Sequence, residues 1–200
     1  MDVALFGAGR IGKIHAGNVA RQPGVTLRYV VDVDAAAAKS LAQQHGAQVA
    51  SVETALADKA VGAVVIGSST DTHSDLITRS AAAGKAIFCE KPVDLSVERA
   101  RACADAVKRA GVACMIGFNR RYDPTFAAVK ERLVQGEVGD PEMLVVTSRD
   151  PGAPPVDYLK RSGGIFWILQ IRSMSCSDAL TKKYCCSRRS SLPRTCSSFG

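Results

Sequence analysis

The sequence predicts an α/β protein built on a doubly wound parallel sheet, and three observations lead to this fold class. Short apolar runs alternate along the chain with segments of helical length. The runs are continuously apolar, which is typical of strands buried on both faces. Gly24, Gly46, Gly84 and Gly111 each fall just after a predicted helix or just before a predicted strand, where C-cap glycines belong.

The elements follow in a regular order. Strands are expected at Val3–Phe6, Leu27–Val31, Ala63–Ile66, Ala86–Cys89 and Ala113–Ile116, with a short one at Ala47–Ala50. Helices are expected at Ile11–Ala20, Ala35–His45, Thr72–Ala83 and Val97–Ala110. Ligands of such sheets bind at the carboxyl ends of the strands. Polar residues follow several of these ends, as a binding site requires.

The first strand runs straight into Gly7-Ala8-Gly9-Arg10-Ile11-Gly12, a G-x-G-x-x-G turn that opens a helix. Gly7 allows a tight turn because it has no Cβ. Gly9 lets the backbone approach a pyrophosphate, and Gly12 lets the helix lie against the strand. The helix then directs its N-terminal N–H groups at the phosphates. The fold is therefore expected to be of the Rossmann dinucleotide-binding type.

The second predicted strand ends at Asp32, about 20 residues after the turn, where this fold places the acid that binds the adenosine ribose. A carboxylate there favours NAD and repels the 2′-phosphate of NADP. Asp34 is an alternative to Asp32. Arg10 leaves NADP open, because a cation near the turn can also meet a phosphate.

Composition narrows the class of protein. The net charge of +7 comes mainly from residues 167–200, which hold six basic residues and one acidic residue. We therefore expect a near-neutral enzyme-like domain with a basic tail and no nucleic-acid partner. No signal peptide or membrane-length apolar run is visible, so a cytoplasmic protein without a membrane partner is expected. Cys89, Cys103 and Cys114 are scattered and read as reduced apolar residues.

Further motifs carry a resemblance to a known family. They are Thr72-His73, Phe88-Cys89-Glu90-Lys91-Pro92, Gly117-Phe118-Asn119-Arg120-Arg121-Tyr122-Asp123-Pro124, Gly136–Pro141, Ser148–Pro151 and Ser162–Phe166. Together with the glycine turn, they resemble the glucose–fructose oxidoreductase and inositol dehydrogenase (Gfo/Idh/MocA) family over residues 1–166. The likeness is greatest to its inositol 2-dehydrogenases. The resemblance implies an NAD(P)-dependent oxidation of a cyclitol or sugar hydroxyl, in which hydride passes to nicotinamide C4.

The resemblance also implies roles for individual residues. Lys91 would be catalytic and would hydrogen-bond the reacting hydroxyl. A free lysine has a pKa of about 10.4. Burial would lower the pKa of Lys91 toward that of a base, while Glu90 would oppose the shift. As a cationic donor, Lys91 would instead steady a developing alkoxide. Pro92 permits a cis peptide that would aim Lys91.

The remaining candidates bind cofactor or substrate. The cofactor candidates are Gly7, Ala8, Gly9, Arg10, Ile11, Gly12, Asp32, Ser69, Thr70, His73 and Glu90. The substrate candidates are Lys91, Asn119, Arg120 and Arg121. For His73, a role as a capping or packing residue is as well supported as contact with the cofactor. Asn119, Arg120 and Arg121 could equally hold two domains together. His15 and His45 read as helix-surface residues.

Three segments are expected: a cofactor domain over 1–120, the incomplete start of an α/β substrate domain over 121–166, and an irregular, aberrant and disordered tail over 167–200. In inositol dehydrogenases the Gly-Gly-Ile-Phe stretch leads to an Asp and, four residues on, a proton-transferring His. No histidine follows His73, and Asp178 receives no role. Four cysteines crowd the tail without metal-ligand spacing, so no metal is expected. We take out-of-frame coding after Phe166 as the working hypothesis.

Three functions are weighed. The first is an oxidoreductase of the inositol 2-dehydrogenase type that binds NAD but is catalytically impaired, with the family's homo-oligomer interface missing. The second is a non-enzymatic NAD(P)-binding regulatory module. The third is a basic interaction protein that uses its tail.

Overall fold

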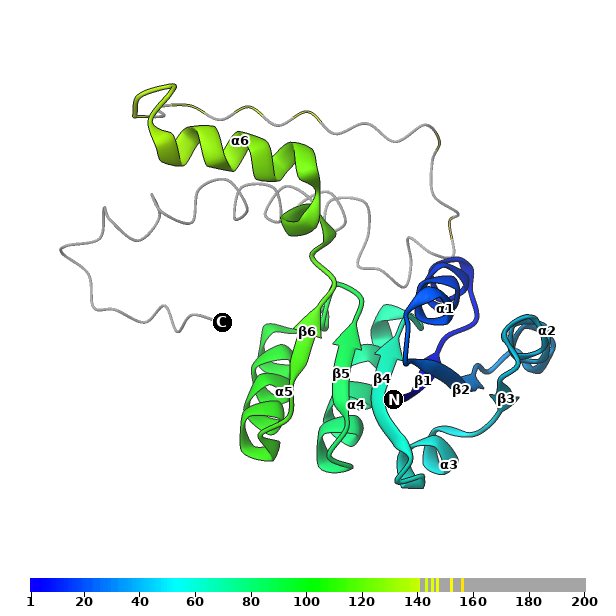
Figure 1. Cartoon of the computed structure of the whole chain (residues 1–200). Helices are drawn as coiled ribbons and strands as arrows, with labels where there is room; N and C mark the ends of the chain where they lie inside the picture. The colour runs from blue at the N-terminus through cyan, green and yellow to red at the C-terminus, as the bar shows by residue number, and fades with distance from the viewer. Residues whose placement is uncertain (141–142, 144, 146, 148–151, 153–155, 157–200) are drawn as a thin grey trace. The chain divides into compact units, whose positions relative to one another are not determined.

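The computed structural model of the chain describes residues 1–140, 143, 145, 147, 152 and 156 (Figure 1). These residues belong to two compact units, one containing Met1–Gly117 and the other containing the described part of Phe118–Ala153. Much of the expected second segment and the whole expected tail, with Asp178 and the four tail cysteines, lie outside the described residues.

The first unit contains a six-stranded parallel sheet with the order β3-β2-β1-β4-β5-β6. Its strands are β1 (Asp2–Phe6), β2 (Thr26–Val31), β3 (Gln48–Val49), β4 (Val61–Ile66), β5 (Ala86–Cys89) and β6 (Cys114–Ile116). The predicted strands are confirmed, with the short one reduced to two residues. Because β4 pairs with β1, chain order reverses between these two strands, which is the switch point where ligands of such sheets bind.

Helices connect the strands, as predicted. The four expected helices are α1 (Arg10–Arg21), α2 (Ala35–His45), α4 (Thr70–Ala82) and α5 (Val97–Ala110). The short helix α3 (Val52–Ala57), capped by Ser51, was not predicted. Gly46 and Gly111 are the left-handed C-caps of α2 and α5. At α4, Ala83 holds the C-cap position and Gly84 follows it with a left-handed φ of 70°, so a glycine ends this helix as predicted. At α1, Gln22 holds the C-cap position, so the prediction fails for Gly24.

Two apolar cores lie on opposite faces of the sheet. Successive side chains of a strand point to opposite faces. In β1, Leu5 accordingly packs with residues of α1 and α2, while Phe6 packs with residues of α3, α4 and α5. Both side chains are almost fully buried. The two-sided burial explains why the strands are apolar without alternation, and it confirms the predicted doubly wound fold.

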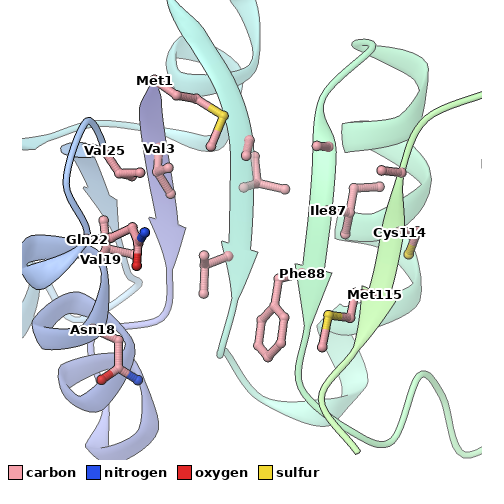
Figure 2. Close-up of a pocket in the computed structure, with 15 residues that line it drawn as sticks. Met1, Val3, Asn18, Val19, Gln22, Val25, Ile87, Phe88, Cys114 and Met115 are labelled. Carbon is pink, nitrogen blue, oxygen red and sulfur yellow. The ribbon is translucent and has the colours of Figure 1, made fainter.

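An apolar hollow lies on one face of the sheet (Figure 2). Side chains of β1, β4, β5 and β6 form its floor, with Asn18 and Val19 of α1, and Gln22 directly after that helix, along one side. Among the described residues that line it there is no carboxylate, lysine or arginine. The hollow is therefore chemically unlike the polar edge where the candidate site lies.

The second unit contains the 3₁₀ turn η1 (Asn119–Tyr122) and helix α6 (Pro124–Gln135). Asp123 caps α6 by accepting hydrogen bonds from Thr125 N and Phe126 N, and Pro124 occupies its first turn. Nowhere in the described ranges is there a helix with the length and apolar character needed to cross a bilayer.

Candidate functional site

The glycine turn has the geometry that its sequence predicts. Gly7 has a φ of 109°, and a Cβ there would lie 2.6 Å from the backbone of Gly67 and Ser68. A Cβ at Gly12 would lie 1.9 Å from Gly7 O. These two positions therefore need glycine for the fold itself, because β1, β4 and α1 approach one another too closely for a side chain.

Gly9 differs from its two neighbours in the motif. It is the N-cap of α1, its φ is −70°, and a Cβ there would meet no protein atom within 4 Å. The fold would therefore tolerate a side chain at position 9. The open space in front of the α1 N-terminus is what a pyrophosphate would need in order to reach the backbone N–H groups.

Two of the six described α-helices lack a side-chain cap. Side chains of Asp34, Ser51, Ser96 and Asp123 cap α2, α3, α5 and α6. At α1 and α4, the N-cap residues Gly9 and Ser69 make no cap hydrogen bond. These two helices follow β1 and β4, the strands that flank the switch point. Their first-turn N–H groups, which no side chain caps, and their positive dipole ends both favour an anion.

Asp32 lies beside the turn. Its Oδ2 accepts a hydrogen bond from Ala8 N at 2.5 Å, and its Oδ1 accepts one from Asp34 N at 2.8 Å. The side chain of Asp34 is engaged elsewhere, because it caps α2 through Ala36 N and Ala37 N. Of the two acids, Asp32 is therefore the one placed next to the glycine turn. Arg10, the first residue of α1, is exposed beside it.

Glu90, Lys91 and Pro92 follow β5, and the Lys91–Pro92 peptide bond is cis, as the sequence allows. Glu90 N donates to Ile66 O of β4 at 2.9 Å, which extends the sheet pairing by one residue. His15 Nε2 donates to Glu90 Oε1 at 3.0 Å. Burial raises the pKa of Glu90, but the hydrogen bond and charge of His15, together with Lys91, bring this pKa below its usual value.

His73 is buried, with 2 % of its surface exposed. Its Nδ1 lies 2.7 Å from Pro92 O, and its Nε2 lies 3.2 Å from Ser68 O. Because a carbonyl oxygen only accepts, the shorter distance places a hydrogen on Nδ1, which donates to Pro92 O. The ring thus joins the segment after β4 to the segment after β5. This is the packing role considered for His73, while contact with a cofactor stays a prediction.

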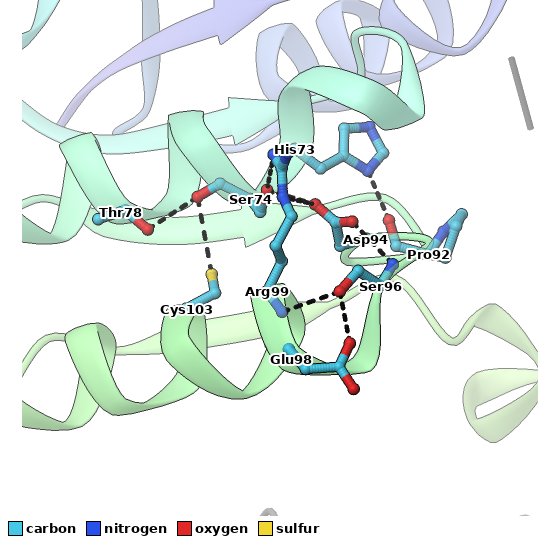
Figure 3. A network of polar contacts seen from close by, with 9 residues as sticks. All are labelled: His73, Ser74, Thr78, Pro92, Asp94, Ser96, Glu98, Arg99 and Cys103. Atoms are coloured by element: carbon cyan, nitrogen blue, oxygen red, sulfur yellow. Dashed lines mark hydrogen bonds and ion pairs between the residues drawn. The ribbon is translucent and has the colours of Figure 1, made fainter.

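A polar network fixes the segment that follows Lys91 (Figure 3). Asp94 lies at its centre, with 9 % of its side chain exposed. Its carboxylate accepts hydrogen bonds from Ser74 Oγ and Ser96 N and forms an ion pair with Arg99 Nε at 2.9 Å. Burial raises the pKa of Asp94, but these bonds from Ser74 and Ser96 and the charge of Arg99 lower it below the usual value. The network ties the segment to α4 and α5.

The other predicted residues are found as follows. Ser69 and Thr70 form the start of α4, and Thr72 Oγ1, one turn on, lies 2.7 Å from Ser68 Oγ. Asn119, Arg120 and Arg121 belong to the second unit, where they form η1. Arg120 lies over the Phe126 ring and 3.5 Å from Asp123, and Arg121 lies over the Phe118 ring. Within that unit both arginines thus contact aromatic rings.

The sequence reasoning was wrong about His15, which was taken as a helix-surface residue. Only 15 % of its side chain is exposed. A usable signal was present, because residues three apart share a helix face and Gly12 marks the face of α1 that lies against β1. Ser74, Asp94 and Arg99 were also missed, and no sequence spacing singled them out.

Comparison with known proteins identifies the family of this chain. The family model described as "Oxidoreductase family, NAD-binding Rossmann fold" (Gfo/Idh/MocA) matches residues 1–118, which include the glycine turn and Glu90-Lys91-Pro92. The chain belongs to the Gfo/Idh/MocA oxidoreductase family. The expected resemblance and the expected NAD-binding Rossmann fold are thereby confirmed.

Individual members of the Gfo/Idh/MocA family are also similar to the chain. An inositol 2-dehydrogenase of Rhizobium meliloti is 52% identical over 162 residues, which cover 81% of this chain and 49% of that protein. The crystal structure of a myo-inositol dehydrogenase from Corynebacterium glutamicum has a TM-score of 0.82 and 41% identity, and the match covers 90% of this chain and 54% of that one. A scyllo-inositol dehydrogenase from Lactobacillus casei, solved with bound NAD(H) and scyllo-inositol, has a TM-score of 0.67 and 27% identity, covering 70% and 42%. The chain spans about half the length of the curated relatives it matches.

Proposed function

We propose that this chain binds NAD at the carboxyl edge of its sheet and carries the cofactor half of an inositol 2-dehydrogenase-type site. The observation that carries this proposal is the pair of uncapped helix N-termini at α1 and α4, beside the turn at Gly9. The pyrophosphate would be held by the N–H groups of Gly9, Arg10 and Ile11, with Ser69 and Thr70 at the second terminus. Asp32 would bind the ribose, which favours NAD over NADP.

We further propose that Lys91 acts on the substrate, a cyclitol or sugar. The bound cofactor supplies a hydride acceptor at nicotinamide C4, and the substrate hydroxyl loses its proton as its carbon loses hydride. Lys91 would donate a hydrogen bond to that oxygen and stabilise the charge that develops on it. Asn119, Arg120 and Arg121 stay proposed substrate-binding residues.

Turnover by the 200-residue chain is expected to be weak. The inositol dehydrogenases use a histidine for proton transfer, and the sequence contains no histidine after His73. The division of the chain into a cofactor domain, the start of a substrate domain and a tail, with bounds near residues 120 and 166, stays a proposal. A non-enzymatic NAD(P)-binding regulatory module stays the alternative to an enzyme.

Calorimetric titration of the full chain with NAD+ and NADP+ tests the first step. Saturable binding of NAD+, tighter than that of NADP+, is expected, and no binding of either would refute the proposal. An assay with myo-inositol and NAD+ then follows NADH absorbance. Lys91→Ala is expected to abolish residual turnover with NAD+ binding intact, while Lys59→Ala, in an exposed turn before β4, serves as the matched control. Retained turnover in Lys91→Ala would remove Lys91 from the mechanism.

A further inference from the structure

His15 and Glu90 join two elements that meet at the cofactor site. His15 lies in α1, the helix that begins at the glycine turn, and Glu90 directly follows β5 and precedes Lys91. Their side chains meet at 3.0 Å, with 15 % and 18 % of their surfaces exposed. Most of this pair is therefore removed from water, where a charge interacts more strongly with its neighbours than at the surface.

The pair is enclosed by its surroundings. The edge of the His15 ring packs on Phe88, with 5.1 Å between ring centroids. A Cβ at Gly67 would lie 3.7 Å from His15 Cδ2, and a Cβ at Gly117 would lie 3.4 Å from Glu90 Cδ. The glycines that follow β4 and β6 thus leave space beside the imidazole and the carboxylate, in which a Cβ would make only ordinary contacts with these two groups. The hydrogen bond from His15 fixes where the carboxylate lies.

The charge of the pair is also set by its contacts. Burial raises the pKa of Glu90, yet His15 and Lys91 together bring it below the usual value. Glu90 is therefore a carboxylate at neutral pH, and the charge of Lys91 beside it is of opposite sign. Glu90 thus adds one negative charge beside the cation of Lys91, and removing that charge would make this edge of the sheet less favourable to a cationic ligand.

We propose that Glu90 makes the site prefer the oxidised cofactor, because its carboxylate favours the cationic nicotinamide of NAD+ over the neutral ring of NADH. His15 is the positioning residue that holds this carboxylate. The inference rests on the proposed function, in which Lys91 lies between nicotinamide and substrate, so that the residue before it also lies near the ring. Such a preference would help the site take up NAD+ and release NADH.

The test measures dissociation constants for NAD+ and NADH with the full chain. Glu90→Gln keeps the shape of the side chain and removes its charge. We expect Glu90→Gln to lower the ratio of NAD+ affinity to NADH affinity about tenfold, because the charge that it removes is partly screened by water. Glu90→Asp keeps the charge and is expected to stay within about threefold of the wild-type ratio.

His15 is tested with two variants and a control. His15→Phe removes the donor and is expected to shift the ratio in the same direction as Glu90→Gln, by a smaller factor. His15→Gln offers a side-chain N–H and is expected to restore the wild-type ratio, and His45→Phe, in the last turn of α2, is expected to leave it unchanged. Equal weakening of both cofactors by His15→Phe would show that His15 is only structural.

The outcomes distinguish failure of this inference from failure of the proposed function on which it rests. If wild-type chain binds neither cofactor, the proposed function fails. If both cofactors bind and Glu90→Gln leaves their ratio unchanged, the proposed function stands and the charge preference is refuted. Thermal unfolding of each variant shows that the compared proteins are folded, and His15→Phe, which removes the group that holds the carboxylate, provides the second test if Glu90→Gln does not fold.

Discussion

Replacing Gly9 by alanine adds one methyl group at the N-cap of α1, where a Cβ would meet no protein atom within 4 Å. The backbone there has φ −70° and ψ −167°, which alanine adopts without strain. Alanine is a poorer N-cap than glycine by roughly 1 kcal/mol. It also lowers the entropy of the unfolded chain, which offsets about 0.4–1 kcal/mol of that cost. The free energy of unfolding should therefore change by less than about 1 kcal/mol, a Tm shift of a few degrees.

Binding should respond very differently. The added methyl group would occupy the space in which a pyrophosphate oxygen reaches the backbone N–H groups. A hydrogen bond to a charged group contributes about 1.5–3 kcal/mol. The loss of one such bond weakens binding by roughly 10- to 150-fold, since about 1.4 kcal/mol corresponds to a factor of ten. Calorimetric titration with NAD+ measures this factor, and thermal unfolding of the same samples measures stability.

Gly17→Ala is the matched control for this experiment. Gly17 lies inside α1, and a Cβ there would approach only Arg21 Nη1, at 4.0 Å. This change should stabilise the helix by up to about 1 kcal/mol and leave NAD+ affinity unchanged. Wild-type affinity in Gly9→Ala would refute the reasoning, because the turn would then not be where the pyrophosphate binds.

Three further substitutions test other parts of the structure. Leu5→Ala opens a cavity at a fully buried site and should cost about 2–5 kcal/mol in urea unfolding, whereas Ile14→Ala, half exposed on α1, should cost much less; equal costs would contradict the assigned core. Asp32→Asn removes the charge beside the turn and should weaken NAD+ while strengthening NADP+, as paired titrations would show; an unchanged ratio would exclude Asp32 as the discriminating acid. The lowered pKa of Asp94 means that its carboxylate stabilises the fold above the usual carboxyl pKa of about 3.9. This stabilisation is lost as the pH falls through the lower folded pKa. Asp94→Asn should therefore be less stable at pH 6 and lose less stability between pH 6 and pH 3, and parallel unfolding curves for the two proteins would contradict this.

Sequence reasoning found the sheet because its central strands β1, β4 and β5 are largely buried, and such strands stand out as short apolar runs. It missed α3, whose six residues are too few to show a helical period. It also missed α6, although Asp123 followed by Pro124 is a readable helix start. Local signals therefore identify elements when a pattern has room to repeat.

In the candidate site, too, the residues that could be predicted are those that a local pattern identifies. The glycine turn and Asp32 were predictable because one βα unit contains both. The His15–Glu90 pair joins residues 75 positions apart, and the Ser74–Asp94 bond joins residues 20 apart. Such contacts depend on how α1, α4 and β5 pack, which a single sequence without the fold does not reveal.

The uncapped starts of α1 and α4 imply a conflict between stability and function. Helix capping is a common way to raise the melting temperature of a protein, and a side chain that capped α1 from position 9 would gain a few tenths of a kcal/mol. The same side chain would occupy the N–H groups at which we propose that the cofactor binds. A selection for thermostability alone would therefore favour variants that fill these helix ends, and such variants would melt later while losing the cofactor.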